Sequence, residues 1–141
     1  MATDLSRPLK AAIIDHLASS PVVTALVPMS RIYAMTPPAT PRWPFIRYGS
    51  PITSGYDATC WDGSATRVTL HAFAETTTTY AGEDRALDIA AAIVEAMKEF
   101  GPDNLGIVEN QYVQTTCIKD DDEADKWHSI VEFNLTVVEP V

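Results

Sequence analysis

The side chains best suited to chemistry in this sequence belong to two cysteines and three histidines: Cys60, Cys117, His16, His71 and His128. No two of them are close in the sequence, whereas zinc sites usually include a close pair of ligands. In the β-hairpin predicted below, Cys117 lies directly across from His128. A thiolate–imidazole pair could act as a nucleophile or as half of a metal site. Because such catalysis ordinarily demands a third, orienting group, we favour two unrelated neighbours on the polar face of the hairpin.

A second group of chemistry-bearing residues is an acidic segment near the C-terminus. Its five acids are Asp120, Asp121, Asp122, Glu123 and Asp125. Together with Glu132, three of them match positions 1, 3, 5 and 12 of a calcium-binding loop, but the sixth position, which needs glycine, is Lys126. We therefore interpret the segment as a solvated hairpin tip, which would resist aggregation at the sheet edge and could meet a basic patch.

Two common enzyme motifs are missing. Loops that bind nucleotide phosphates need clustered glycines, and the six glycines of this chain form neither G-x-G-x-x-G nor a Walker loop. The sequence DGSA at residues 62–65 does not match the G-x-S-x-G of serine hydrolases, and we interpret it as a turn before a strand. We expect no cofactor and no catalytic site.

Length, composition and charge set further bounds. The chain has 141 residues, 46% of them hydrophobic, which predicts a single domain over residues 1–141 with a substantial core. Its net charge of −9 argues against binding duplex DNA through the phosphates. Residues 1–70 carry six basic and four acidic side chains, whereas residues 71–141 carry four basic and fifteen acidic ones. That asymmetry suits head-to-tail or ring assembly, although a solvated acidic face is the simpler alternative.

The sequence also predicts where the protein resides. No apolar run approaches the roughly 18 residues of a membrane helix, and the N-terminus lacks the apolar region of a secretory signal. Two cysteines do not form a disulfide framework, so we expect two free thiols in a reducing compartment.

Hydrophobic periodicity predicts two main helices. Leu5, Leu9, Ile13 and Leu17 recur every four residues, which indicates a helix that starts near Ser6. A second apolar stripe runs along residues 83–100 and ends before the Gly-Pro at 101–102. A short helical turn is expected over residues 21–26. Residues 35–44 are rich in proline and predict an extended loop or arm, because proline cannot donate backbone hydrogen bonds.

Alternating side chains predict the strands. Residues 31–34, 45–48 and 66–74 are strand candidates, and residues 49–64 are rich in turn formers. The last forty residues predict a long β-hairpin with strands at 107–118 and 127–138 and its tip at 119–126. Centring its turn places Ile118 opposite Trp127 and Tyr112 opposite Phe133. The fold class is therefore α+β: one mostly antiparallel sheet with a long C-terminal hairpin, covered on one face by two main helices.

Aromatic side chains gather in and beside the Pro-rich and turn-rich segments. They could form a contact surface, or they could fold back on the core, and the sequence leaves both alternatives open. The candidate interface residues here are Arg42, Trp43, Tyr48, Tyr56 and Trp61, alongside the five acids of the hairpin tip.

The order of these segments resembles that of a known family. The N-terminal helix carries LKAAIIDHLASSPVVTALV, and the next block reads RIYAMTPPATPRWPFIRYGS. A strand that ends in LHAFAE precedes the helix AGEDRALDIAAAIVEAM, and the hairpin KDDDEADKWHSIVEFNLTV closes the pattern. Over nearly the whole chain, this layout resembles the tail completion or tail terminator proteins of long-tailed phages and gene transfer agents. The resemblance lies in the layout, since none of these segments is a catalytic signature.

The resemblance implies a structural role in a virion or phage-like particle assembled in the bacterial cytoplasm. Such proteins form a ring, commonly of six copies, that caps the head-proximal end of the tail tube and joins the tail to the head connector. The implied partners are other copies of the chain, the tail tube protein and the connector or stopper protein. DNA would pass through the lumen without specific binding, and no membrane is involved.

Three alternatives remain at this point. The chain could be a head-completion stopper or adaptor of the connector. It could be a small hydrolase or metal-dependent enzyme, which would need Cys117 and His128, or Asp121 and Glu132, to converge in a pocket. It could also be a ligand-binding module, which would show one dominant apolar pocket.

Overall fold

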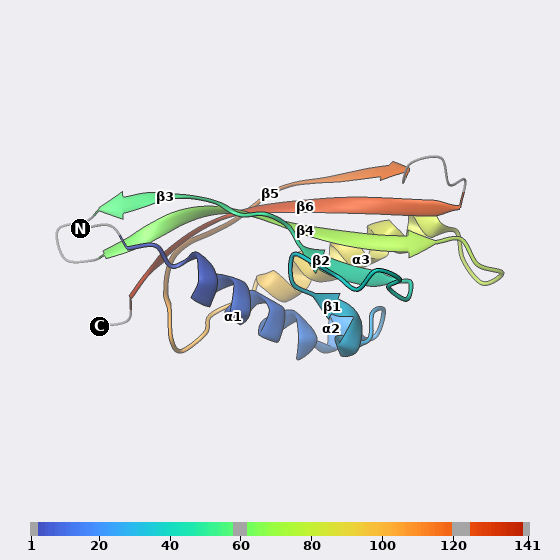
Figure 1. Ribbon diagram of the computed structural model, residues 1–141, viewed down its shortest axis with the longest axis horizontal. Coiled ribbons are helices and arrows are strands. Elements are labelled where there is room, and N and C mark those ends of the chain that lie inside the picture. Colours follow the sequence, from blue (N-terminus) through green and yellow to red (C-terminus); the bar gives the residue numbers. More distant parts are fainter. Residues whose placement is uncertain (1–2, 58–61, 120–124, 140–141) are drawn as a thin grey trace.

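A computed structural model describes residues 3–57, 62–119 and 125–139 of the chain, and these form a layer of strands beside a layer of helices (Figure 1). The helices are α1 (Ser6–Ala18), α2 (Pro21–Thr24), the 3-10 turn η1 (Met29–Arg31) and α3 (Gly82–Met97). The strands are β1 (Ile32–Tyr33), β2 (Phe45–Tyr48), β3 (Ile52–Asp57), β4 (Asp62–Glu75), β5 (Gly106–Lys119) and β6 (Lys126–Val138).

The strands form one sheet in the order β1-β2-β4-β6-β5, and β3 pairs with the first half of β4 next to β2. Every pairing is antiparallel except that of β1 with β2. The predicted α+β class, with a mostly antiparallel sheet and a C-terminal hairpin, is confirmed. The strands that come first in the chain lie on one side of β4, and the C-terminal hairpin lies on the other.

The core lies between the sheet and the two main helices, which both run along the same face of the sheet (Figure 1). The α1 stripe of Leu9, Ile13 and Leu17 is fully buried, as its four-residue spacing requires. Ile89 and Ile93 of α3 are also fully buried. Burying a side chain of this size contributes about 1.5–3 kcal/mol, so this face supplies most of the driving force for folding.

Local signals explain where α3 begins. The Gly82 backbone N–H donates to Thr76 Oγ1 at 2.9 Å, and Glu83 and Asp84 in the first turn complement the helix dipole. A Cβ at Gly82 would lie 2.8 Å from both Thr76 N and Trp127 Cδ1. Glycine is required here because the strand and the helix approach each other closely.

The interpretation of the segment between β2 and the start of β4 is wrong. Residues 49–64 were expected to be turns, but they include β3 and the start of β4. Most β3 side chains are exposed, so the segment lacks the apolar alternation that marks a strand, and its order comes from pairing with β4.

The hairpin strands lie within a residue of their predicted bounds, but the register is only partly as predicted. Tyr112 lies opposite Phe133 as expected, whereas Ile118 lies opposite His128 instead of Trp127. The register shifts between Tyr112 and Gln114, where β5 holds an extra residue. A bulge of this kind moves all later pairings by one position.

In the described part of the chain, every helix is too short or too polar to cross a bilayer.

Candidate functional site

The predicted Cys117–His128 pair does not form. Cys117 lies opposite Ser129 and packs against the edge of the core, whereas His128 pairs with Ile118. Because neighbouring residues of a strand point to opposite faces, the one-residue register shift places the thiol and the imidazole on different sides of the sheet. The predicted register is therefore wrong at this point, and Cys117 and His128 do not form the nucleophile or metal half-site that was the less favoured alternative.

His128 instead contacts His71, on the sheet face opposite α1 and α3, which no helix of the described residues covers. The Nδ1 atom of His71 lies 2.7 Å from Nε2 of His128, and Phe73 stacks on His128 with ring centroids 4.1 Å apart. Burial, then the charge of Arg47 and the neighbouring His128, lower the pKa of His71 to about 4. A neutral pair of imidazoles can share one hydrogen bond, with one ring donating and the other accepting. Among residues 3–57, 62–119 and 125–139, no three His, Cys, Asp or Glu side chains converge as a metal site would require.

The same uncovered face carries a packed aromatic cluster. The Phe45 and Phe73 rings stack at 4.5 Å, and Trp43 meets both edge-on at 5.1 and 5.8 Å. Lys126 Nζ lies 5.6 Å from the centre of the Trp43 ring. Trp43 therefore folds back onto the sheet, yet it stays half-buried on the uncovered side. The end of the Pro-rich loop is held here as well, because Arg31 Nη1 donates to the Trp43 carbonyl at 3.1 Å.

The other aromatic candidates differ in their surroundings. Tyr48 is fully buried in the core, so its side chain cannot be the contact residue that the sequence suggested. Its hydroxyl has no hydrogen-bond partner among the described residues, and burial raises the pKa of Tyr48 to about 12. Tyr56 is half-buried on β3 and Arg42 is exposed in the Pro-rich loop. Trp61 lies outside the described residues.

The calcium-loop pattern is not assembled by the residues that the structure describes. Asp120, Asp121, Asp122 and Glu123 lie outside the described residues. Asp125 is exposed just before β6, and its carbonyl accepts a hydrogen bond from the Thr76 N–H at 2.7 Å. Glu132 lies about 24 Å farther along the chain, seven residues on at a rise of about 3.4 Å per residue. There its carboxylate accepts a 2.6 Å hydrogen bond from Gln114. Glu132 therefore cannot complete a loop that includes Asp125.

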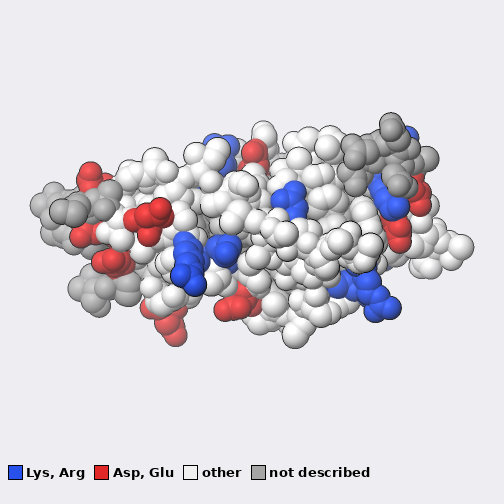
Figure 2. Space-filling view, in the orientation of Figure 1, with Lys and Arg blue, Asp and Glu red and all other residues white. Residues whose placement is uncertain are grey.

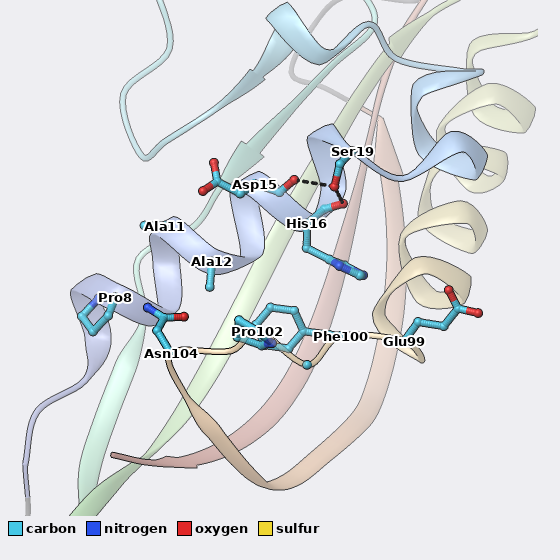
Figure 3. Close-up of a pocket in the computed structure, with 11 residues that line it drawn as sticks. Pro8, Ala11, Ala12, Asp15, His16, Ser19, Glu99, Phe100, Pro102 and Asn104 are labelled. Atoms are coloured by element: carbon cyan, nitrogen blue, oxygen red, sulfur yellow. Dashed lines mark hydrogen bonds between the residues drawn. The ribbon is translucent and has the colours of Figure 1, made fainter. Parts of the chain in front are cut away.

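A hollow of about 360 Å³ between α1 and the segment after α3 contains aspartate, histidine and serine side chains (Figure 3). Ser19 Oγ donates to the backbone carbonyls of Asp15 and His16, at 3.0 and 3.2 Å. His16 Nε2 lies 2.7 Å from the Ala96 carbonyl. The serine and the histidine are thus engaged by the backbone, and they do not form a nucleophile–base pair.

Apolar side chains are exposed mainly at the two edges of the sheet. Eight large hydrophobic residues are exposed in the described part, and six of them lie at or beside edge strands. Met29 and Met35 flank β1, Ile52 lies on β3, and β5 carries Val108, Tyr112 and Ile118. A hollow of about 460 Å³ beside β5 is lined by Met97, Tyr112 and Phe133, among others. On the face in Figure 2, acidic and basic side chains are interspersed, with acids gathered at the end where β3 and both termini lie. The structure thus has apolar edges and a mixed charged surface.

A protein-family model described as "Tail completion protein gp17" matches residues 11–138. The chain belongs to the tail completion protein gp17 family. No curated protein matches its sequence. The predicted resemblance to tail completion proteins is confirmed, and with it a structural role in completing the tail of a phage or phage-like virion.

Solved structures from a gene transfer agent virion and from bacteriophage SPP1 share the fold. A chain of the "Virion of native gene transfer agent (GTA) particle" is 19% identical and superposes with a TM-score of 0.75, over 92% of this chain and 94% of that one. The "Structure of bacteriophage SPP1 gp17 protein" is 21% identical with a TM-score of 0.60, over 93% of this chain and 89% of that one. At these identities, the likeness establishes the fold of this tail completion protein and leaves its contacts to be inferred.

Sequence reasoning missed the His71–His128 contact and the apolar sheet edges. The alternation in residues 66–74 and 127–138 placed both histidines on strands, but only the pairing of β4 with β6 brings them together. The exposure of Met29 and Tyr112 depends on which strands lie at the edges, which is a property of the topology and not of the local pattern.

Proposed function

We propose that copies of this tail completion protein close into a ring, six in number, that ends the tail tube at its head-proximal end and joins it to the head connector. The observation that supports the ring is the presence of two unlike apolar edges on one small sheet. A closed ring is built from heterologous contacts, each of which needs two different and complementary patches on every subunit.

The charge of the chain suits a ring through which DNA passes. A net charge of −9 gives the molecule little affinity for phosphates, so DNA would not adhere to the lumen. We place the acidic hairpin tip, of which the exposed Asp125 is the described residue, near the lumen or the tube. There its carboxylates would repel the DNA backbone.

Removal of the protein from particles tests the proposed position. In a producer strain without this chain, we expect filled heads and tube ends that do not join, seen by electron microscopy, and complementation in trans should restore joined particles. Normal joined particles without the chain would contradict the proposal.

Binding of the purified protein separates the terminator from the stopper or adaptor. We expect the protein to bind the ends of isolated tail tubes. Binding to connector complexes, and never to tube ends, would instead identify it as a stopper.

Neutralising the five acids of the tip tests the lumen assignment. The variant D120N/D121N/D122N/E123Q/D125N should keep the wild-type unfolding temperature, because a solvated tip contributes little to the core, but it should alter ring assembly or DNA passage. Unchanged infectivity or gene transfer in this variant would remove the lumen assignment while leaving the ring proposal intact.

A further inference from the structure

The two edges of the sheet come from different halves of the chain. Strands β1, β2 and β3 all precede β4, whereas β6 and β5 follow it, so the order β1-β2-β4-β6-β5 places early residues at one edge and late residues at the other. Residues 29–47, around β1, contain three arginines and no acid. Residues 95–119, from the end of α3 through β5, contain four acids and two lysines. The two edges therefore carry opposite net charge.

The β5 edge is hollowed and apolar. The α3 helix does not fully cover β5, and the hollow of about 460 Å³ between them is lined by Val94, Met97, Phe100, Tyr112 and Phe133 together with Lys98 and Asn110. Met97 and Phe133 form its buried floor, with 1% of each residue exposed, and Tyr112 is 46% exposed at its rim. Two acids are exposed beside the hollow: Glu95 on the last turn of α3, where it pairs with Lys98 at 2.9 Å, and Glu99 just after the helix ends.

The β1 edge has projecting apolar side chains. Met29, 64% exposed, begins the η1 turn that leads into β1, and Met35, 40% exposed, follows the strand. Arg42 is exposed in the same Pro-rich segment. Methionine adapts to irregular apolar hollows because its side chain is unbranched and flexible. The β1 edge therefore has projecting apolar side chains and a positive net charge, which complement the hollow and the negative net charge of the β5 edge.

Resting on the proposed ring, we propose that its subunit contact joins these two edges. Met29 and Met35 of one copy enter the hollow between α3 and β5 of the next copy, and Arg42 faces Glu99, just after α3. A symmetric contact of β5 with β5 would set like charges together and leave the β1 edge uncovered, so the complementarity favours the head-to-tail arrangement. The two register shifts along β5 make a continuous strand pairing unfavourable, which is why the contact is made by side chains.

Two matched aspartate substitutions test the apolar part of this contact. Met29→Asp would place a carboxylate in an apolar contact, and we expect assembly on tail-tube ends to weaken by at least about tenfold because of its desolvation cost. Leu87→Asp is the control, since Leu87 is 41% exposed in the first half of α3 and is not among the residues that line the hollow. Both variants should fold like the wild type, as checked by circular dichroism, and the Leu87 variant should assemble normally.

A charge exchange tests the polar part. Arg42→Glu and Glu99→Lys should each weaken ring assembly alone, whereas an equal mixture of the two variants should assemble into alternating rings with wild-type efficiency. In the mixture each contact is complementary again. The introduced glutamate of one variant meets the introduced lysine of the other at one contact, and the native Arg42 meets the native Glu99 at the next. Native mass spectrometry should show rings with three copies of each variant, the composition that alternation in a six-membered ring requires.

The outcomes separate the inference from the proposal on which it rests. Rings that form as well with Met29→Asp as with the wild type, or a mixture of charge variants that does not restore assembly, would overturn the edge-to-edge contact. A wild-type protein that forms no ring, even on isolated tube ends, would contradict the proposed function itself.

Discussion

The two faces of the central sheet are built from the same strands, but their side chains differ in how deeply they are buried. On β4 and β6, Leu70, Val131 and Phe133 point to the helices and are at most 1% exposed. Their strand neighbours, such as His71 and Phe73, point to the uncovered face and are half-buried among one another. The comparison shows that alternate residues of these strands have different roles. Those on one face form the core against α1 and α3, whereas those on the other face stack on one another.

Truncation of one phenylalanine on each face tests this contrast with the largest effect. Phe133→Ala should lower the free energy of unfolding by about 3–5 kcal/mol, because it leaves a cavity under α3. Phe73→Ala should cost about half as much or less, since its ring is partly solvated and a gap there opens to water. Denaturant unfolding of both variants provides the measurement, and equal losses would show that the uncovered face is a second core.

Lowering the pH should destabilise the uncovered face. The pKa of His71 lies at about 4 in the folded chain against the ordinary value of 6.5, so the unfolded state binds the proton first. The contribution of His71 to the free energy of unfolding should have its full value above pH 6.5 and should be lost as the pH decreases toward about 4. Allowing for solvent screening of this half-exposed ring, we expect a loss on the order of 1 kcal/mol.

The His71→Gln variant isolates that contribution. Its thermal unfolding temperature should fall less than that of the wild type between pH 7 and pH 4, although carboxylates titrate in both proteins. Parallel pH profiles of the two proteins would show that His71 carries no linkage to folding.

Removal of a buried hydroxyl on the covered face should leave stability unchanged or raise it slightly, in contrast with the losses expected above. Tyr48 Oη is buried and finds no partner in the described part of the chain, so Tyr48→Phe should leave stability unchanged or raise it by up to about 1 kcal/mol. Ser129, whose hydroxyl is also buried and unpaired, offers the matching variant Ser129→Ala. Calorimetry measures both, and a loss above about 1 kcal/mol would mean that the hydroxyl is used.

The smallest effect is expected for the polar network on the uncovered face. Arg67 Nε donates to Asn134 Oδ1 at 2.6 Å and its Nη1 lies 3.9 Å from Glu132, but the Arg67 side chain is 41% exposed. Arg67→Ala should cost about 0.5 kcal/mol, and less in high salt. A loss comparable with that of Phe133→Ala would remove the distinction between the faces.

The sequence predicts where the helices and strands lie better than it predicts how the strands pair and in which register. The stripes of α1 and α3 and the alternation of β4 and β6 follow from a buried face, so their spacing alone locates them. The register of the hairpin tip does not, because the extra residue between Tyr112 and Gln114 has no local signature. The strand β3 was missed for a related reason, as its exposed side chains show no apolar period.

The candidate site shows the same limit. Trp43 and Tyr48 are aromatic residues five positions apart, yet one lies on the uncovered face and the other is fully buried. The position of Tyr48 depends on which alternate residues of β2 point into the core, and that of Trp43 depends on where the Pro-rich loop returns to the sheet. Both are tertiary properties. The charge difference between the halves of the chain could be read directly, and the topology turns it into a difference between the two edges.

Electron cryomicroscopy of intact particles, with this subunit located in the map, tests the central claim most directly. The account predicts a closed ring at the junction of tail tube and head, with the β5 edge of each copy against the β1 edge of the next. A single copy at that junction, or copies that touch through the helix layer with both sheet edges free, would contradict it.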